Sequence, residues 1–313
     1  MIHNSIKGAI LLSALLLSAC DKRDDVELVP APEAVVLNNG NVQEGGNCAT
    51  LSPWGFPQHA SGETLRIKQY LCHNDFALLY NSSSGVSDWI VEKITKEKID
   101  SDYPYIEDNF RRDPALHDEN AISPEEYDIS NSKGWVKGIM TGVGDYKYTK
   151  KSQSQAYYMT NVAPMNSYMY ENVYSVLNKN IRNWARSYGD LYVITAPIYY
   201  QGKPLDYLGN KAIGALIVEG TKASLGESGK ARIAVPTHYL KVIFSPKLKQ
   251  MMVYIIPNQP FDVKSLPAYK TTLWNAEQIS GYKFFNQFPA SFKNQMLYQI
   301  ANWPINYNIV ENK

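Results

Sequence analysis

The chain has 313 residues, of which 44% are hydrophobic and 19% charged, and its formal net charge at pH 7 is +1. This length and composition indicate one large folded domain, or two small ones, with an ordinary hydrophobic core. They exclude a basic field over the whole molecule of the kind that marks many nucleic-acid-binding or membrane-surface proteins. The 23 tyrosines are a high count. We interpret them first as packing residues of sheet surfaces and interfaces, and only second as a platform for stacked bases.

The N-terminal segment has the composition of a targeting sequence. Lys7 precedes an apolar run over residues 9–19, which at about 11 residues is too short to cross a bilayer. The run ends in Leu-Ser-Ala-Cys at 17–20, which resembles the bacterial lipobox. The resemblance implies cleavage before Cys20 and lipid attachment to its sulfur; a plain secretory signal with an incidental cysteine is the alternative. We therefore expect a signal peptide over 1–19 and a lipid-anchored membrane protein of the bacterial cell envelope that faces the periplasm.

Residues 20–46 predict a flexible tether. The segment is charged at first, then contains proline, and ends rich in glycine and asparagine, with too few large apolar residues to pack. The folded domain is therefore predicted over residues 47–313. With Cys20 lipidated, Cys48 and Cys72 remain as an even pair in an oxidising compartment. They predict a disulfide between the start of the domain and its first strand, and without clustered histidines they make a poor metal site.

Several elements are predicted from patterning alone. Alternating apolar residues over 76–80, a turn of Asn-Ser-Ser-Ser-Gly at 81–85 and a second strand around 89–91 indicate a β-hairpin. Residues 100–133 are polar and irregular. The β-prone stretch 134–165 predicts a strand, a charged turn at Lys150 and Lys151, and a second strand. Apolar residues at helical spacing then predict an amphipathic helix over 167–187, which Gly189 ends.

The stretch from Gly134 to Met165, GWVKGIMTGVGDYKYTKKSQSQAYYMTNVAPM, resembles the core of the DNA/RNA non-specific endonuclease family. That family combines a D-R-G-H signature with a later F-Y-L-T-N-I-S-P-Q segment. Further resemblances lie at 189–199 and 233–243, similar to the family strands V-V-T-G-P-I-Y and V-P-T-H-F-F-K-V-V, and at 252–258 and 279–285. The resemblance covers about residues 47–290. It implies an α+β fold, a central antiparallel sheet with flanking helices, and a ββα-metal motif.

The resemblance also assigns roles to individual positions. In the family a histidine activates water, an asparagine holds Mg²⁺, and an arginine neutralises phosphate charge. The D-R-G-H signature becomes Val136, Lys137, Gly138 and Ile139 in this chain, so the histidine position is an isoleucine, which accepts no proton. Lys137 is the candidate phosphate-binding residue and Asn161 the candidate ligand of Mg²⁺ or another divalent metal.

The helix that follows carries a further asparagine and a glutamate in the family. These positions fall on Tyr170 and Asn178, so that Asn178 is a weak second metal candidate. A slip of one residue in the alignment would turn Glu171 toward the site instead.

Other polar residues are interpreted as structural. We expect His73 to have a surface or hairpin-end role and His238 a scaffold role. Four carboxylates ahead of the signature predict a solvated loop rather than catalysts: Asp113, Glu125, Glu126 and Asp128. Lys147, Lys150 and Lys151 predict a solvated turn, and the Gly-rich segment 219–230 an exposed loop.

Three functional hypotheses follow from these observations. The first is a membrane-anchored nuclease-fold protein that has lost efficient catalysis and retains binding of nucleic acid or metal. The second is an active Mg²⁺-dependent endonuclease in which Lys137 stabilises phosphate, Asn161 holds the metal, and Asp145, Asp128 or a tyrosine recruits water. The third is a non-enzymatic envelope protein that uses the fold as a scaffold for a partner. Loss of several site residues together favours the first.

Overall fold

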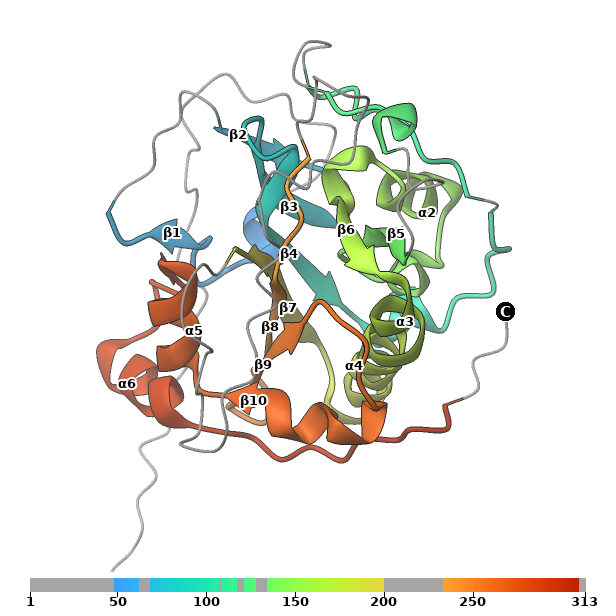
Figure 1. Cartoon of the computed structure of the whole chain (residues 1–313). Helices are drawn as coiled ribbons and strands as arrows, with labels where there is room; N and C mark the ends of the chain where they lie inside the picture. The colour runs from blue at the N-terminus through green and yellow to red at the C-terminus, as the bar shows by residue number, and fades with distance from the viewer. Residues whose placement is uncertain are drawn as a thin grey trace, which may run out of the picture.

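A seven-stranded sheet runs through the middle of the molecule (Figure 1). The computed structural model describes residues 48–61, 68–106, 108–116, 121–127, 134–199 and 233–309. All neighbouring strands of this sheet are antiparallel. In spatial order they are β10 (Lys270–Thr271), β9 (Gln250–Pro257), β8 (His238–Ser245), β7 (Leu191–Ile198), β4 (Val86–Ile94), β3 (Phe76–Asn81) and β2 (Lys68–Cys72).

Each face of the sheet carries its own hydrophobic cluster, because successive side chains of a strand point to opposite faces. On β8, Tyr239 and Ile243 pack into one cluster, whereas Leu240, Val242 and Phe244 pack into the other. All eight residues of β8 are buried. Both faces are therefore covered, which explains why the central strands read as nearly continuous apolar runs.

A ββα unit covers the first face. Its strands β5 (Trp135–Ile139) and β6 (Val162–Asn166) pair antiparallel, and β6 leads directly into a long helix. That helix consists of α3 (Ser167–Met169), a π-helical turn (Tyr170–Tyr174) and α4 (Ser175–Tyr188). Gly189 ends it with a φ of 84°, a conformation that side chains with a Cβ rarely adopt.

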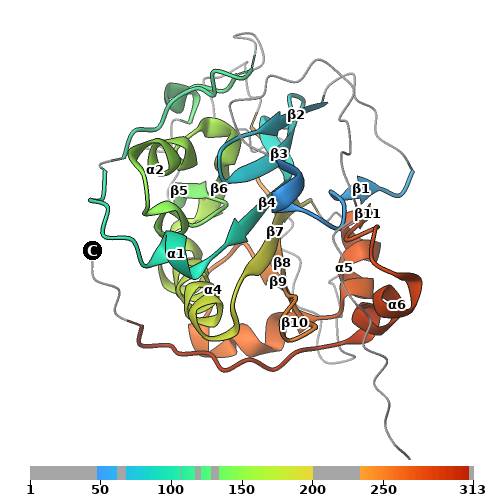
Figure 2. The same ribbon diagram turned by 180° about the vertical axis from the view of Figure 1, so that it is seen from behind.

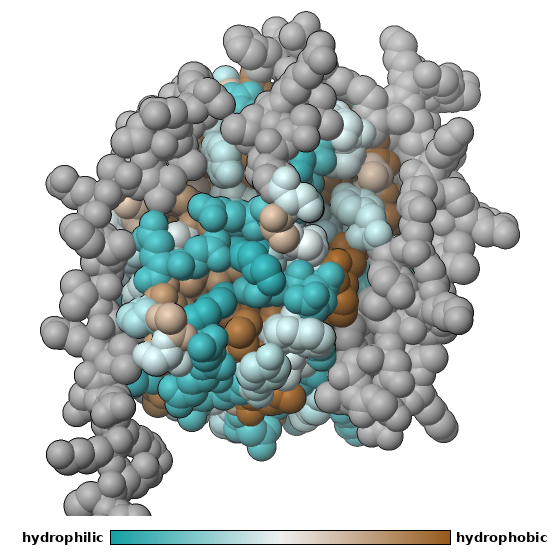
Figure 3. All heavy atoms as spheres, turned by 90° about the vertical axis from the view of Figure 1, so that its left-hand side faces the viewer, coloured by the Kyte–Doolittle hydropathy of each residue, from teal (hydrophilic) through white to brown (hydrophobic). Residues whose placement is uncertain are grey.

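The second face is covered by the two ends of the domain (Figures 1 and 2). Here lie η1 (Cys48–Leu51), α5 (Leu273–Ser280) and α6 (Ala290–Tyr298), and a short ladder joins β1 (Gln58–His59) to β11 (Tyr282–Lys283). Figure 3 views this side and shows mainly hydrophilic side chains among small, separate hydrophobic patches. The remaining elements are α1 (Lys96–Ile99), α2 (Lys150–Ala156), η2 (Pro124–Glu126), η3 (Val143–Tyr146), η4 (Met159–Asn161) and η6 (Val263–Tyr269).

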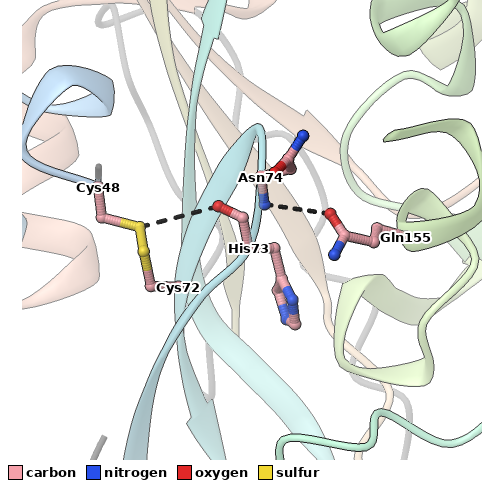
Figure 4. Close-up of a disulfide and its surroundings, with 5 residues drawn as sticks. All are labelled: Cys48, Cys72, His73, Asn74 and Gln155. Carbon is pink, nitrogen blue, oxygen red and sulfur yellow. Dashed lines mark hydrogen bonds between the residues drawn. A yellow bond between two sulfur atoms is a disulfide. The ribbon is translucent and has the colours of Figure 1, made fainter. Parts of the chain in front are cut away.

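The predicted disulfide is confirmed. Cys48 in η1 is bonded to Cys72 at the end of β2, with their Cα atoms 5.9 Å apart (Figure 4). The bond closes a loop with a sequence separation of 24. On the chain-entropy argument, closing such a loop contributes about 3 kcal/mol to stability. The dashed line from Cys48 to the carbonyl of His73, at 4.0 Å, is a van der Waals contact, since a disulfide sulfur carries no proton to donate.

The α+β class, the central antiparallel sheet with flanking helices and the ββα arrangement are confirmed, and one local prediction is wrong. Lys150 and Lys151 do not form a turn between two strands; they open α2, with Thr149 Oγ1 accepting from the Ser152 amide at 3.1 Å. The buried face of α2 is polar: Gln153 bonds to Pro104 and Ile106, and Gln155 to Asn74. Because polar side chains anchor α2 to the rest of the domain, its sequence shows no apolar helical periodicity.

Two expectations concern parts of the chain outside the described residues. These are the signal peptide and tether over 1–46, with the lipidation site Cys20, and the loop 219–230. Within the described residues, no helix combines the length and the apolar character needed to cross a membrane.

Candidate functional site

The site predicted from the signature lies on the ββα unit. In the β5–β6 ladder Lys137 is opposite Pro164, Gly138 opposite Ala163, and Ile139 opposite Val162. A Cβ added to Gly138 would lie 2.2 Å from Cγ of Met165. Glycine is therefore required at this signature position by the close approach of the Met165 side chain, whether or not the site is catalytic.

A cavity of about 710 Å³ opens over β5. Its described lining comes from β5, from η3, from the π-helical turn, from the residue after α2, and from the irregular segment 100–127. The lining residues are Tyr105, Asp108, Phe110, Pro124, Glu125, Tyr127, Val136, Lys137, Ile139, Val143, Tyr157, Tyr170 and Glu171. The irregular segment 100–127 thus forms one wall of this cavity.

The structure brings three of the four signature positions to the cavity. Val136, Lys137 and Ile139 line it, whereas Gly138 faces Met165. Ile139 is 4% exposed, and its amide donates to the phenol oxygen of Tyr170 at 3.4 Å. The position of the family histidine is therefore a buried apolar side chain at the base of the cavity, next to the tyrosine that occupies the family's asparagine position on the helix.

Asn161 lies outside the cavity lining, and its amide is engaged in local structure. Its Nδ2 donates to Thr141 Oγ1 at 2.7 Å and to the Ala156 carbonyl at 2.9 Å, while its Oδ1 accepts from the Thr141 amide at 3.2 Å. The residue is fully buried. In this geometry the Asn161 side chain holds the β5–β6 connection together, and its metal role stays a prediction.

The helix positions give no stronger metal ligand. Asn178 in α4 is 8% exposed and is not among the residues that line the cavity, whereas Tyr170 and Glu171 both line it. Throughout the part of the chain that the structure describes, no group of three or more His, Cys, Asp or Glu side chains could hold a metal ion. The ligand that the family resemblance implies is a single asparagine, and neither Asn161 nor Asn178 lines the cavity. The described lining therefore does not present that amide ligand.

The prediction that Asp113 belongs to a solvated loop is wrong, because this carboxylate is 2% exposed. It accepts from Thr160 Oγ1 at 2.5 Å and pairs with Nε2 of His73 at 2.9 Å. Burial favours a higher pKa for Asp113, but the hydrogen bonds from His73 and Thr160 outweigh it and lower the pKa. Asp113 is a structural anchor, away from the cavity lining.

His73 is at the β2–β3 turn, as predicted for a hairpin-end residue, but it is buried and not on the surface. Its ring packs between Phe76 and Tyr158. His238 at the start of β8 is also buried, and burial lowers its pKa to about 4. Neither histidine lines the cavity, so neither replaces the missing base at Ile139.

Of the remaining charged candidates, some line the cavity and others stabilise the fold or are exposed. Glu125 lines the cavity, whereas Glu126 caps its own turn by accepting from the Ser123 amide at 3.0 Å. Asp145 is ion-paired with Arg182 at 2.8 Å and accepts from the Gly142 amide, so it is not poised to activate water. Lys150 and Lys151 are exposed at the start of α2 and Lys147 is half-buried; none of the three lines the cavity. Asp128 lies outside the described residues.

Sequence reasoning missed a buried charge network between the sheet and the ββα unit. Glu92 of β4 accepts from the Tyr146 hydroxyl at 2.6 Å, and Lys241 of β8 donates to the Met140 carbonyl at 3.0 Å. Burial, followed by the nearby charge of Asp145, raises the pKa of Glu92 to about 8, and burial lowers the pKa of Lys241. The sequence signal was clear only for Lys241, which interrupts the apolar run of β8, because Glu92 is one of several polar residues in β4.

Comparison with known proteins agrees with this geometry. A profile of the DNA/RNA non-specific endonuclease family matches residues 58–291. Human mitochondrial endonuclease G is 24% identical over 222 residues, which are 70% of this chain and 70% of that protein. Nuclease C1 of Cunninghamella echinulata var. echinulata is 25% identical over 237 residues, 74% of this chain and 88% of that protein. For mouse mitochondrial nuclease EXOG the match is 25% over 255 residues and spans 79% of this chain but 63% of that protein.

Among solved structures, the crystal structure of the EndoG/EndoGI complex superposes with a TM-score of 0.64 at 22% identity, covering 82% of this chain and 96% of that one. This likeness shows the fold. The profile match extends over most of the sheet, the ββα unit and both helical layers. The chain therefore belongs to the DNA/RNA non-specific endonuclease family.

Proposed function

We propose that this chain is a nuclease-fold protein of the cell envelope whose site no longer hydrolyses phosphodiesters efficiently. The observation that carries the proposal is Ile139. It occupies the position of the general base, it is buried at the base of the cavity, and none of the described cavity-lining residues is a histidine. Removing a general base usually lowers the rate by about 10²–10⁴.

The surroundings of Ile139 support the same proposal. Val136 and Tyr170 replace the other polar groups that the family resemblance places around the reacting phosphate, and Asn161 is engaged by Thr141 and Ala156. Lys137 alone remains as a phosphate-binding candidate in the cavity. We derive no catalytic step through a metal, because neither candidate asparagine, Asn161 or Asn178, lies in the described lining of the cavity.

The test is cleavage of plasmid DNA and of RNA, with Mg²⁺ or Mn²⁺, by the full-length protein purified in mild detergent. Wild type is compared with the reconstruction Val136→Asp, Ile139→His and Tyr170→Asn. We expect no cleavage above buffer from wild type and a metal-dependent gain of about 10²-fold or more from the reconstruction. The matched control carries Ile139→Asn with the other two changes, so that only the imidazole differs.

Cleavage by wild type that depends on added metal and disappears in Lys137→Ala would overturn the proposal and identify an active nuclease with a rearranged site. The Asn161→Ala variant is a poor probe of catalysis, since its hydrogen bonds hold the β5–β6 connection. Any loss of activity in that variant would report unfolding as readily as a lost ligand.

The anchor is a separate part of the proposal and rests on the lipobox-like sequence at 17–20. We expect wild type expressed in a Gram-negative bacterium to fractionate with membranes and to incorporate labelled fatty acid. Cys20→Ala should remove both signals, and the Cys48→Ala variant, which retains Cys20, should keep both. Membrane association that persists without label in Cys20→Ala would contradict lipid anchoring.

A further inference from the structure

The cavity at the family's active-site position has aromatic walls. Five of its described lining residues are aromatic: Tyr105, Phe110, Tyr127, Tyr157 and Tyr170. Tyr127 and Tyr157 are buried, at 2% and 1% exposed, whereas Tyr105 is 54% exposed. The cavity therefore deepens from a partly open mouth to a floor of buried rings and Ile139, which suits an apolar or cationic body better than a hydrated phosphate.

The charges of the described lining residues oppose a polyanion. Asp108, Glu125 and Glu171 are three carboxylates against the single ammonium of Lys137, a balance of −3 + 1 = −2. All three carboxylates are exposed, so they lie toward the mouth. Proteins that bind nucleic acid neutralise closely spaced phosphates with Lys and Arg. This cavity presents the opposite sign.

Arg111 and Arg112, which directly follow the lining residue Phe110, do not make the cavity positively charged. Arg111 donates to the carbonyls of Asn109 and Ser154, and its guanidinium lies 4.3 Å from the ring centroid of Tyr158. Arg112 is 4.0 Å from a carboxylate oxygen of Glu126. Neither arginine lines the cavity.

The phenols of the cavity act as neutral groups that hold one another in place. The hydroxyls of Tyr105 and Tyr157 are 2.6 Å apart, and Tyr105 also donates to Asp108 at 3.1 Å. Burial, followed by the influence of Asp108 and Tyr105, raises the pKa of Tyr170 to about 12. At neutral pH these residues therefore offer aromatic rings and fixed hydroxyl dipoles beside the carboxylate of Asp108.

A cation already sits over one of these rings. The Lys137 ammonium lies 5.5 Å from the ring centroid of Phe110, within the range of a cation–π contact. This intramolecular contact shows that the wall formed by Phe110 accepts an ammonium group. The cavity of about 710 Å³ is the space left with the Lys137 side chain in place, so it has room for a small ligand.

We propose that this cavity binds a small organic cation, an ammonium group carried on a short apolar body. The rings of Phe110, Tyr157 and Tyr170 would contact the body, and Asp108 with Glu171 would balance the charge. The proposal deepens the proposed function and rests on it, since it assigns the former nuclease site a ligand of opposite charge to a phosphodiester. An inorganic metal ion is not the ligand we infer, because the described carboxylates do not cluster as a metal site requires.

The test is calorimetric titration of the full-length protein in mild detergent with choline. Its neutral isostere 3,3-dimethylbutan-1-ol and the anion adenosine monophosphate are titrated in parallel. Because a cation is attracted by the faces of desolvated rings, we expect choline to bind at least about fivefold more tightly than the neutral isostere. Adenosine monophosphate should bind more weakly than choline.

Variants locate the site. Asp108→Asn and Phe110→Leu should each weaken choline binding at least about threefold, with near-unchanged circular dichroism. The matched control is Asp190→Asn, which removes a surface carboxylate that pairs with Lys93 outside the cavity. This variant should leave choline binding at the wild-type value.

Equal affinity for choline and its neutral isostere would overturn the proposal, as would tighter binding of adenosine monophosphate. Absence of choline binding at roughly 10 mM would do the same. The cleavage assay separates these failures from failure of the proposed function. If wild type cleaves nucleic acid and binds choline, only the proposed loss of catalysis is refuted. If wild type neither cleaves nucleic acid nor binds choline, only the cation site is refuted.

Discussion

At the scale of single residues, Ile139 and Asn161 show that a match to a motif does not by itself assign a role in the site. Both residues align with functional positions of the family, but only Asn161 keeps the family's residue type. For that reason the sequence predicted Asn161 as the metal ligand. In the structure Asn161 is buried with its amide engaged, whereas the altered positions line the cavity. Retention of Asn161 is explained by folding, since its contacts close the connection between β5 and β6.

This structural role makes Asn161→Ala a prediction about stability. The variant removes three hydrogen bonds and leaves the Thr141 amide and the Ala156 carbonyl without that partner in a buried environment. Leaving buried polar groups unsatisfied costs roughly 1–3 kcal/mol each, so we expect a loss of about 2–4 kcal/mol in the free energy of unfolding, measured with urea. Asn172→Ala, on the exposed side of the helix, should cost less than about 1 kcal/mol.

A different result would support the role of Asn161 as a metal ligand. If Asn161→Ala unfolds at the wild-type urea concentration, and Mg²⁺ raises the midpoint of wild type but not of the variant, then the amide serves a metal and not the chain connection.

At the scale of elements, the sequence predicted the strands and the helix that have an apolar pattern, and it missed the helix that is anchored by polar side chains. The hairpin of β3 and β4 and the helix over 167–188 follow from alternating and helical spacing, and the structure confirms both. The helix α2 buries glutamines and a serine, so its seven residues look like a polar turn in sequence. Its formation depends on partners in the segments around 74 and 104–106, which no local pattern contains.

The cavity wall shows the same division. Dense charge over 100–127 predicts a solvated loop, and the segment does contain exposed carboxylates such as Asp108 and Glu125. The same segment also places Tyr105, Phe110 and Tyr127 against the ββα unit. It contains the buried Asp113, which is hydrogen-bonded to His73. The acidic and aromatic character of the site is therefore a tertiary property. It arises from segments up to 66 residues apart, from Tyr105 to Glu171.

At the scale of the whole molecule, the buried charge network joins the two layers that make the site. Glu92 and Lys241 project from the sheet, Asp145 comes from the β5–β6 connection, and Arg182 comes from α4. Tyr146 and Lys98 also face Glu92, and in the described part of the chain Oε1 of Glu92 has no hydrogen-bond partner. The carboxyl is therefore in an environment that favours its protonated form, and its titration couples pH to the packing of the two layers.

The resulting pH dependence has a defined sign. Glu92 titrates near 4.5 in an unfolded chain and near 8 in the folded one. Below the lower value both states hold the proton; as pH rises between the two values, only the unfolded state releases it, so the contribution of Glu92 to stability falls. The fall is at most about 1.4 kcal/mol per pH unit, and it ends once the folded carboxyl has also ionised.

We therefore expect Glu92→Gln, which keeps an acceptor for Tyr146, to lose less stability than wild type between pH 5 and pH 8. The measurement is the free energy of unfolding by urea at each pH, read as the difference between variant and wild type, because other buried groups such as His238 contribute equally to both. Glu97→Gln, an exposed carboxyl in α1, is the matched control and should follow the wild-type curve. If the Glu92→Gln and wild-type curves run parallel over this range, then Glu92 is ionised throughout in the folded state. Lys241 and Lys98 would then balance its charge, and the two layers would be joined by ion pairing instead of by a protonated acid.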